Sequence, residues 1–152
     1  MRFLIQRVLS GDVKINQKTV GSIEKGYVVF VGICDSDNQL IADKMLQKLL
    51  NLRIFEDAEG KTNLSLMDVG GEILFVSQFT LYADCRKGNR PSFINAGKPQ
   101  HAKALYEYLI DSCTKECPGI RIQQGEFGAD MKVSLTNDGP FTIWLDSDTI
   151  IR

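Results

Sequence analysis

Two continuous apolar runs mark the centre of the chain. One is Tyr27–Ile33, with the sequence YVVFVGI; the other is Ile73–Val76, which opens the stretch Glu72–Leu81, EILFVSQFTL. Both are too short for a typical helix and are rich in residues that favour strands, which predicts two buried strands. Between them, Ser36–Gln39 has the spacing of a capping box, and a broad apolar stripe continues to about Leu52. This pattern predicts a strand–helix–strand unit with its two strands parallel.

Shorter segments with alternating apolar and polar residues flank this unit. The strands predicted from them are Phe3–Leu9, Val13–Asn16, Thr19–Ile23, Ile120–Ile122, Met131–Thr136 and Phe141–Leu145. Ser10–Asp12 is interpreted as a turn between the first two, and Asn137–Pro140 as a turn between the last two. A second helix is predicted from Pro99 to about Cys117, where Pro118 and Gly119 stop it. The whole chain, 1–152, is therefore expected to be one α/β domain with two main helices.

The second apolar run ends in polar residues, which is unusual for a buried strand. If the strand continues to its end, Gln78 and Thr80 share one face and Ser77 and Phe79 share the other. The hydroxyl groups either cap neighbouring backbone groups at a strand end or face a cleft. The residue types alone leave both interpretations open.

Two sets of cationic side chains stand out. Arg7 falls on the apolar face of the first strand, where it either extends to the surface or holds a backbone carbonyl with its rigid fork of donors. Arg86, Lys87 and Arg90 surround a glycine and an asparagine in an irregular segment. That segment is either a solvated loop or a contact for phosphate groups.

Composition and charge narrow the function classes. The chain has 152 residues, a net charge of −1 and 43% hydrophobic residues, which fits one domain and argues against a globally basic nucleic-acid binder. We expect a cytoplasmic protein without a signal peptide or membrane span. Its four cysteines form no CxxC pair and it has one histidine, so free thiols and no metal site are expected. No cofactor fingerprint occurs, and no cofactor is expected.

Five segments carry a resemblance to a known family. They are QRV at 6–8, LRIFED at 52–57, NLSLMDVGGEILFVSQFTLYADCRKGNRPSF at 63–93, GEFGADM at 125–131 and NDGPFT at 137–142. Together they closely resemble the D-aminoacyl-tRNA deacylases of the bacterial and eukaryotic type, whose signatures SQFTL and NxGPxT are both present. The likeness extends over essentially the full chain. It implies a three-layer α/β/β fold with mixed sheets, in a homodimer with each active site at the dimer interface.

The resemblance also implies roles for individual residues. The pocket for the terminal adenosine and its aminoacyl ester would be lined by the catalytic set Ser77, Gln78, Phe79 and Thr80. The adenine side would be bounded by Phe127, Gly128, Ala129 and Met131.

Chiral selection is implied for Gly139 and Pro140, joined by a cis bond that enters the other subunit's pocket. Arg7 and Asn137 would support this motif. We infer from charge that the loop with Arg86, Lys87 and Arg90 contacts the tRNA backbone.

The implied reaction is hydrolysis of an activated ester, which releases a free D-amino acid and refuses L-aminoacyl-tRNA. Thr80 could attack as a nucleophile, but no base is evident near it in the sequence. We favour water activated by the free hydroxyl of the terminal ribose, with backbone amides around Phe79 and Thr80 holding the oxyanion. Glycine mischarged on tRNA for alanine should also be accepted. A nucleic-acid-binding scaffold and a general esterase using Ser77 or a cysteine are the alternatives.

Overall fold

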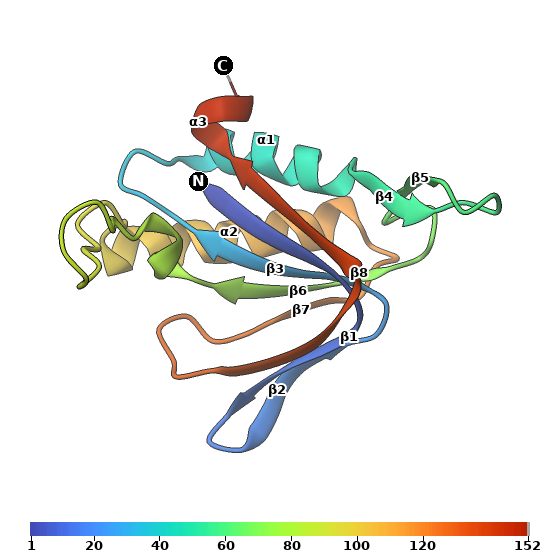
Figure 1. Ribbon diagram of the computed structural model, residues 1–152, viewed down its shortest axis with the longest axis horizontal. Coiled ribbons are helices and arrows are strands. Elements are labelled where there is room, and N and C mark those ends of the chain that lie inside the picture. The colour runs from blue at the N-terminus through green and yellow to red at the C-terminus, as the bar shows by residue number, and fades with distance from the viewer. Residues whose placement is uncertain (152) are drawn as a thin grey trace.

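A computed structural model describes residues 1–151. Its centre is a six-stranded mixed sheet, with a separate two-stranded sheet at one end (Figure 1). The strands are β1 (Arg2–Ile15), β2 (Lys18–Ile23), β3 (Gly26–Gly32), β4 (Arg53–Glu56), β5 (Thr62–Ser65), β6 (Glu72–Ser77), β7 (Ile122–Gln124) and β8 (Lys132–Asp146). The helices are α1 (Gln39–Leu50), the 3-10 helix η1 (Phe79–Tyr82), α2 (Pro99–Glu116) and α3 (Ser147–Ile150).

The predicted strand–helix–strand unit is confirmed. β3 and β6 pair in parallel, with Tyr27 opposite Ile73 and Val31 opposite Ser77, and α1 connects them. The helix begins at Gln39, because Asn38 is its N-cap and accepts a hydrogen bond from the Ile41 amide at 3.0 Å. Ser36, predicted as the cap, instead lies outside the helix.

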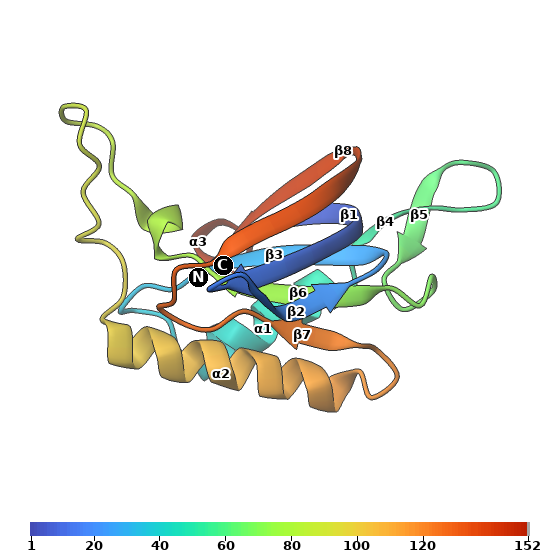
Figure 2. The same cartoon turned by 90° about the horizontal axis from the view of Figure 1, so that it is seen from below.

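The main core lies between this part of the sheet and the two long helices. Figure 2 shows α2 along one side of the sheet. Large side chains from the strands and helices are fully buried there, among them Phe3, Tyr27, Met45, Phe75 and Tyr106. Burial of each such side chain contributes about 1.5–3 kcal/mol to folding, so the helix layer is held mainly by apolar contact.

The turn predicted at Ser10–Asp12 is wrong, because β1 runs through these residues without a break. The strand is continuous from Arg2 to Ile15 and pairs with β3 along its first half and with β2 along its second. At Gly11 an added Cβ would lie 2.8 Å from Cγ2 of Val28. The glycine therefore lets the Val28 side chain approach the backbone of a long strand. In the sequence, a glycine with this role cannot be distinguished from one in a turn.

β8 corrects a second prediction, since the two expected strands are one. It pairs with both halves of β1, with Gln6 opposite Thr142 and Val8 opposite Asn137. Between those pairs β1 has only Arg7, whereas β8 has residues 138–141, which form an outward bulge. The turn expected at Asn137–Pro140 is thus this bulge.

The second half of the sheet folds over to form the third layer. Val8, Val13, Ile23, Val28, Leu74 and Val76 form a smaller core there. The α/β/β layering expected from the resemblance is confirmed, in a mixed sheet that nearly closes on itself. All four cysteines are free thiols, as predicted. None of the helices in residues 1–151 is long and apolar enough to span a membrane.

Candidate active site

The polar end of the second apolar run is where β6 stops. The strand ends at Ser77, and Phe79–Tyr82 forms the 3-10 helix η1, so the strand-like alternation predicted to Leu81 is wrong. The Gln78 amide donates to the Val31 carbonyl at 2.8 Å, which ties the turn to β3. At Gly32 an added Cβ would lie 2.9 Å from Leu81 Cβ. Only a glycine lets η1 lie so closely across the end of β3.

The change from strand to 3-10 helix exposes two residues of the signature. Phe79 and Thr80 are exposed, whereas Ser77 and Gln78 are half-buried. The Gln78 side-chain amide donates to Thr80 Oγ1 at 2.5 Å. A helical turn leaves its first N–H groups without partners inside the helix. The backbone N–H groups of Phe79 and Thr80 are therefore presented beside the Thr80 hydroxyl.

A second segment, the loop 125–131, is anchored to the same strand end. The Phe75 carbonyl accepts from the Gly125 amide at 2.9 Å and from the Tyr106 hydroxyl at 3.0 Å. The Phe127 ring packs against Tyr106 with ring centroids 6.0 Å apart. Gly128 has a φ of +79°, a left-handed conformation that glycine adopts readily. These contacts place the loop along the edge of the β6 end.

The two segments enclose a hollow of about 320 Å³. It is lined by Val76, Ser77, Gln78, Phe79, Phe127, Gly128, Ala129, Asp130, Met131 and Val133. The structure thus brings together residues from the predicted catalytic set and from the predicted adenine side. Thr80 is not one of the lining residues, but it is hydrogen-bonded to Gln78, which is. Asp130 is the titratable residue in this lining, and Lys132 holds its carboxylate at 2.9 Å.

The bulge of β8 carries the other signature and is closed by Asn137. The Asn137 Oδ1 accepts from the Phe141 amide at 2.6 Å, and its Nδ2 donates to Gln6 Oε1. Gly139 and Pro140 lie at the exposed apex, joined by a cis peptide bond. Neither lines the hollow beside Ser77 in the same chain. The sequence signatures therefore occupy two separate places within one chain.

Arg7 holds the bulge from inside the protein. It is 6% exposed, and its guanidinium donates from Nε to the Asp138 carbonyl at 3.0 Å and from Nη1 to the Ile54 carbonyl at 2.6 Å. The same group lies 4.5 Å from the centroid of the Phe141 ring. Of the two interpretations open in the sequence, the fork that binds backbone carbonyls is the one observed.

The basic loop extends from the body of the protein between η1 and α2 (Figure 2). Its base is closed by reciprocal hydrogen bonds between the backbones of Asp84 and Ser92, at 2.7 and 2.9 Å. The Arg86 guanidinium donates twice to Asp84, at 2.9 and 2.6 Å, and holds the pKa of that carboxyl at about 2. Arg86 is thus already paired, whereas Lys87 and Arg90 are exposed without an ion pair among the described residues.

One contact of this loop was missed by the sequence reasoning. Phe93 follows the closed base and packs edge-on against Phe79, with ring centroids 5.1 Å apart and planes at 72°. The sequence feature that could have indicated this contact is an aromatic residue, Phe93, at the end of the basic loop, which itself comes directly after SQFTL.

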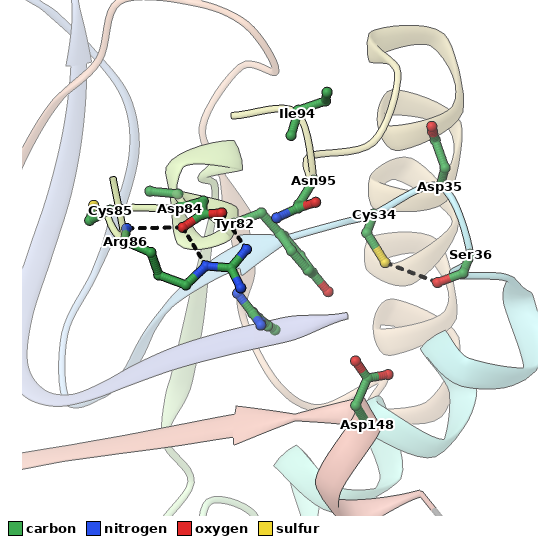
Figure 3. A pocket seen from close by; sticks show the side chains of 12 residues that line it. Cys34, Asp35, Ser36, Tyr82, Asp84, Cys85, Arg86, Ile94, Asn95 and Asp148 are labelled. Atoms are coloured by element: carbon green, nitrogen blue, oxygen red, sulfur yellow. Dashed lines mark hydrogen bonds and ion pairs between the residues drawn. The ribbon is translucent and has the colours of Figure 1, made fainter. Parts of the chain in front are cut away.

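A larger hollow, of about 740 Å³, is lined by residues outside both signatures (Figure 3). Its walls include Cys34, Tyr82, Arg86 and Asn95. Burial, and to a smaller extent the neighbouring Cys34 side chain, raises the pKa of the Tyr82 hydroxyl. Arg2 lies over the Tyr82 ring at 4.3 Å. The motifs place the candidate site in the smaller hollow rather than here.

Comparison with solved structures defines the class of protein. A solved structure named "c-Myc DNA Unwinding Element Binding Protein" aligns with a TM-score of 0.91 and 39% identity over 96% of this chain and 98% of that chain. A probable eukaryotic D-amino acid tRNA deacylase shares the fold, with a TM-score of 0.82, 20% identity and coverage of 95% and 97%. These comparisons define the class by its fold: a single α/β domain with the mixed sheet of these two structures.

The sequence comparisons identify the family within that class. The model described as D-Tyr-tRNA(Tyr) deacylase matches residues 4–146. The D-aminoacyl-tRNA deacylase of Thermosipho melanesiensis is 51% identical over 150 residues, 99% of each chain. That of Lactobacillus acidophilus is 55% identical over 146 residues, 96% of this chain and 99% of the relative. The chain belongs to the D-Tyr-tRNA(Tyr) deacylase family, which confirms the resemblance in its motifs.

Proposed function

We propose that the chain removes D-amino acids from tRNA by hydrolysing the ester bond. As a member of this family it is an aminoacyl-tRNA ester hydrolase. The observation that carries the proposal is the hollow that joins the end of β6 to the loop 125–131, because it unites the residues of two family motifs that lie about 50 positions apart. Its substrate would be a D-aminoacyl-tRNA, as the names of its relatives say of them.

The hollow is suited to the terminal adenosine. Phe127 and Met131 provide apolar surface for a base, and the polar wall at Ser77 and Gln78 provides hydrogen-bonding groups for the ribose. The ester would then lie toward Thr80, where the backbone N–H groups of Phe79 and Thr80 are presented. Those donors would stabilise the developing oxyanion.

The attacking group is water rather than Thr80. The Gln78 amide donates to Thr80 Oγ1 and so cannot take its proton. Asp130 is held by Lys132, and His101 lines a different hollow beside Leu40 and Tyr108. Since none of these described side chains is positioned to activate Thr80, the free hydroxyl of the terminal ribose would activate the water. An ester is already activated, so positioning and oxyanion stabilisation supply most of the catalysis.

Chiral selection would come from Gly139 and Pro140 of a second subunit in a homodimer. Three features support this assignment: the apex is exposed, it is fixed by Asn137 and Arg7, and it is absent from the hollow of its own chain. A wall of backbone rejects by collision, so an L side chain would be refused and varied D side chains would be tolerated. Glycine mischarged on tRNA for alanine would pass the same filter.

The tRNA backbone would contact the basic loop. Lys87 and Arg90 are free to meet phosphates, whereas Arg86 would first have to leave Asp84. Such contacts position the tRNA without selecting its sequence. Activity on tRNA also fits a cytoplasmic protein with free thiols.

The deciding experiment compares D-tyrosyl-tRNA and L-tyrosyl-tRNA as substrates of the same preparation. We expect release of free D-tyrosine and retention of the L ester. Binding of tRNA without hydrolysis would instead favour a nucleic-acid-binding role, the second candidate, because the 39% identical structure bears the name of a DNA-binding protein. Equal turnover of simple acyl esters would favour a general esterase.

Mixed dimers test whether each site draws on two subunits. One subunit carries Thr80→Trp and the other Gly139→Ala. If Thr80 and Gly139 of different chains form one site, the mixed dimer retains one intact site and about half of the wild-type activity, while each variant homodimer is inactive. If each chain completes its own site, the mixed dimer is as inactive as the homodimers. A fully active monomer in sedimentation would also reject the dimeric site.

A further inference from the structure

Two aromatic rings in contact with one another are exposed beside the hollow. Phe79 is 56% exposed and Phe93 is 38% exposed, although their centroids are 5.1 Å apart. Aromatic side chains usually stabilise a protein because their rings are buried. Neither belongs to either of the two apolar cores. The pair therefore has ring surface available to a ligand.

The position of Phe93 is fixed although it lies in a long loop. It directly follows Ser92, whose backbone is paired with Asp84, and its carbonyl accepts from the Ala96 amide at 3.0 Å. Further along, the Gly97 amide donates to the Ile33 carbonyl at 2.8 Å and the Lys98 amide to Asp35 at 2.8 Å. The loop is thus held at both ends, and the ring of Phe93 is positioned against η1 by these bonds.

The loop that leads to Phe93 also carries positive charge. Lys87 and Arg90 lie between Asp84 and Ser92, in the part of the loop beyond its closed base, and both are exposed. Aromatic faces beside a cationic segment are the combination that binds single-stranded nucleic acid, because the bases stack on the rings and the phosphates meet the cations. Double-stranded RNA would offer phosphates but no free base faces.

We propose that Phe79 and Phe93 form a stacking platform for the unpaired nucleotide that precedes the terminal adenosine of the substrate tRNA, with Lys87 and Arg90 holding its phosphates. This inference rests on the proposed function. Phe79 lines the hollow assigned to the terminal adenosine, and Phe93 contacts Phe79 without being one of the lining residues. If the last base of a single-stranded RNA end enters the hollow, the base before it would lie at the platform formed by the two rings.

The test compares two substrates that differ in the upstream nucleotides. D-tyrosyl-tRNA has them, and the D-tyrosyl ester of adenosine lacks them. For Phe93→Ala we expect kcat/KM on the tRNA to fall about tenfold or more, since stacking of one base on an aromatic ring has that effect, while the adenosine ester is hydrolysed as by wild type. Phe93→Trp should restore activity on tRNA. Ile94→Ala, which removes the neighbouring exposed side chain, is the matched control and should change neither substrate.

A binding measurement gives a second readout that does not need turnover. The affinity of the uncharged trinucleotide CCA should fall about tenfold in Phe93→Ala. Lys87→Ala and Arg90→Ala should each reduce the slope of log affinity for tRNA against log salt by about 0.7 for a lost phosphate contact. Lys115→Ala, at the far end of α2, should leave the slope unchanged.

The outcomes separate this inference from the function on which it rests. If wild type hydrolyses neither D-substrate, the proposed function fails and the platform fails with it. If wild type is active and Phe93→Ala loses both substrates equally, Phe93 acts by shaping the hollow through Phe79 and the platform is rejected. Unchanged activity on tRNA together with unchanged CCA affinity rejects it as well.

Discussion

The two family signatures form regions of opposite character. SQFT at the end of β6 is one wall of a hollow that also needs the loop 125–131, and two of its four residues are exposed. NDGPFT on β8 forms an outward bulge that Asn137 closes with its own hydrogen bonds and Arg7 holds from the core. One region is concave and open, and the other is convex and rigid. The difference supports our proposal that each is completed by the other across two subunits.

The largest loss of activity is expected from a substitution of Gly139, in the convex region. Gly139 has a φ of +142°, and an added Cβ would lie 2.9 Å from the Phe141 amide nitrogen. Gly139→Ala should displace the bulge, and a shift of about 1 Å at a catalytic site can cost about 100-fold in rate. The measurement is kcat/KM on D-tyrosyl-tRNA. Gly60→Ala is the matched control, because Gly60 also has positive φ but no atom lies within 4 Å of its added Cβ.

Removing the support of the bulge should separate the two regions. Arg7→Ala deletes charged hydrogen bonds to the carbonyls of Asp138 and Ile54, each worth about 1.5–3 kcal/mol. We expect a lower midpoint of thermal unfolding and a clear loss of D-tyrosyl-tRNA hydrolysis, while the affinity for free adenosine is retained. Arg121→Ala removes an exposed guanidinium and should leave all three unchanged. Equal loss of adenosine affinity in Arg7→Ala would contradict the separation.

A smaller effect is expected in the concave region. Thr80→Ala removes one hydroxyl, which accepts from the Gln78 amide and which in our proposal binds or orients without acting as the nucleophile. Loss of one hydrogen bond costs roughly 0.5–1.5 kcal/mol, so kcat should fall about two- to twelvefold. Single-turnover kinetics with D-tyrosyl-tRNA measure this directly. Capture of an acyl-enzyme on Thr80 would show instead that it is the nucleophile.

The smallest effect concerns the base of the basic loop. The Arg86 guanidinium lowers the pKa of Asp84 from 3.8 to about 2. The stability contributed by this pair is therefore fully present above pH 3.8 and is lost as the pH falls through about 2. An NMR titration of the Asp84 carboxyl should give a midpoint near 2, and Arg86→Gln should return it toward 3.8. A midpoint near 3.8 in the wild type would mean that the pair does not form in solution.

Predictions from the hydrophobic pattern were confirmed where burial alone explains the pattern. The two apolar runs and the stripe between them predicted β3, α1 and β6, because burial on both faces imposes continuous apolar residues. Gly11 shows where such signals mislead. A glycine beside a serine and an aspartate resembles a turn, yet its cause was the approach of Val28 from a neighbouring strand.

The candidate site could be predicted only in pieces. Both signatures and the adenine-side segment were recognisable as motifs, and the hollow unites Ser77 with Phe127 as the family resemblance implied. The bond of Arg7 to the Ile54 carbonyl and the contact of Phe93 with Phe79 were not predictable, since neither produces a periodic signal. The pairing of Arg86 with Asp84 likewise depends on side-chain geometry rather than on charge spacing.

By itself the sequence determined the family, the strand–helix–strand unit and the residues that we propose for the chemistry, because motifs and hydrophobic periodicity are local properties. Only the tertiary structure decided that β1 is one strand, that β6 gives way to a 3-10 helix after Ser77, and that residues 138–141 bulge outward. Each of these depends on strand register and on contacts between residues far apart in the chain. Such contacts exist only once the sheet has formed, so no local pattern records them.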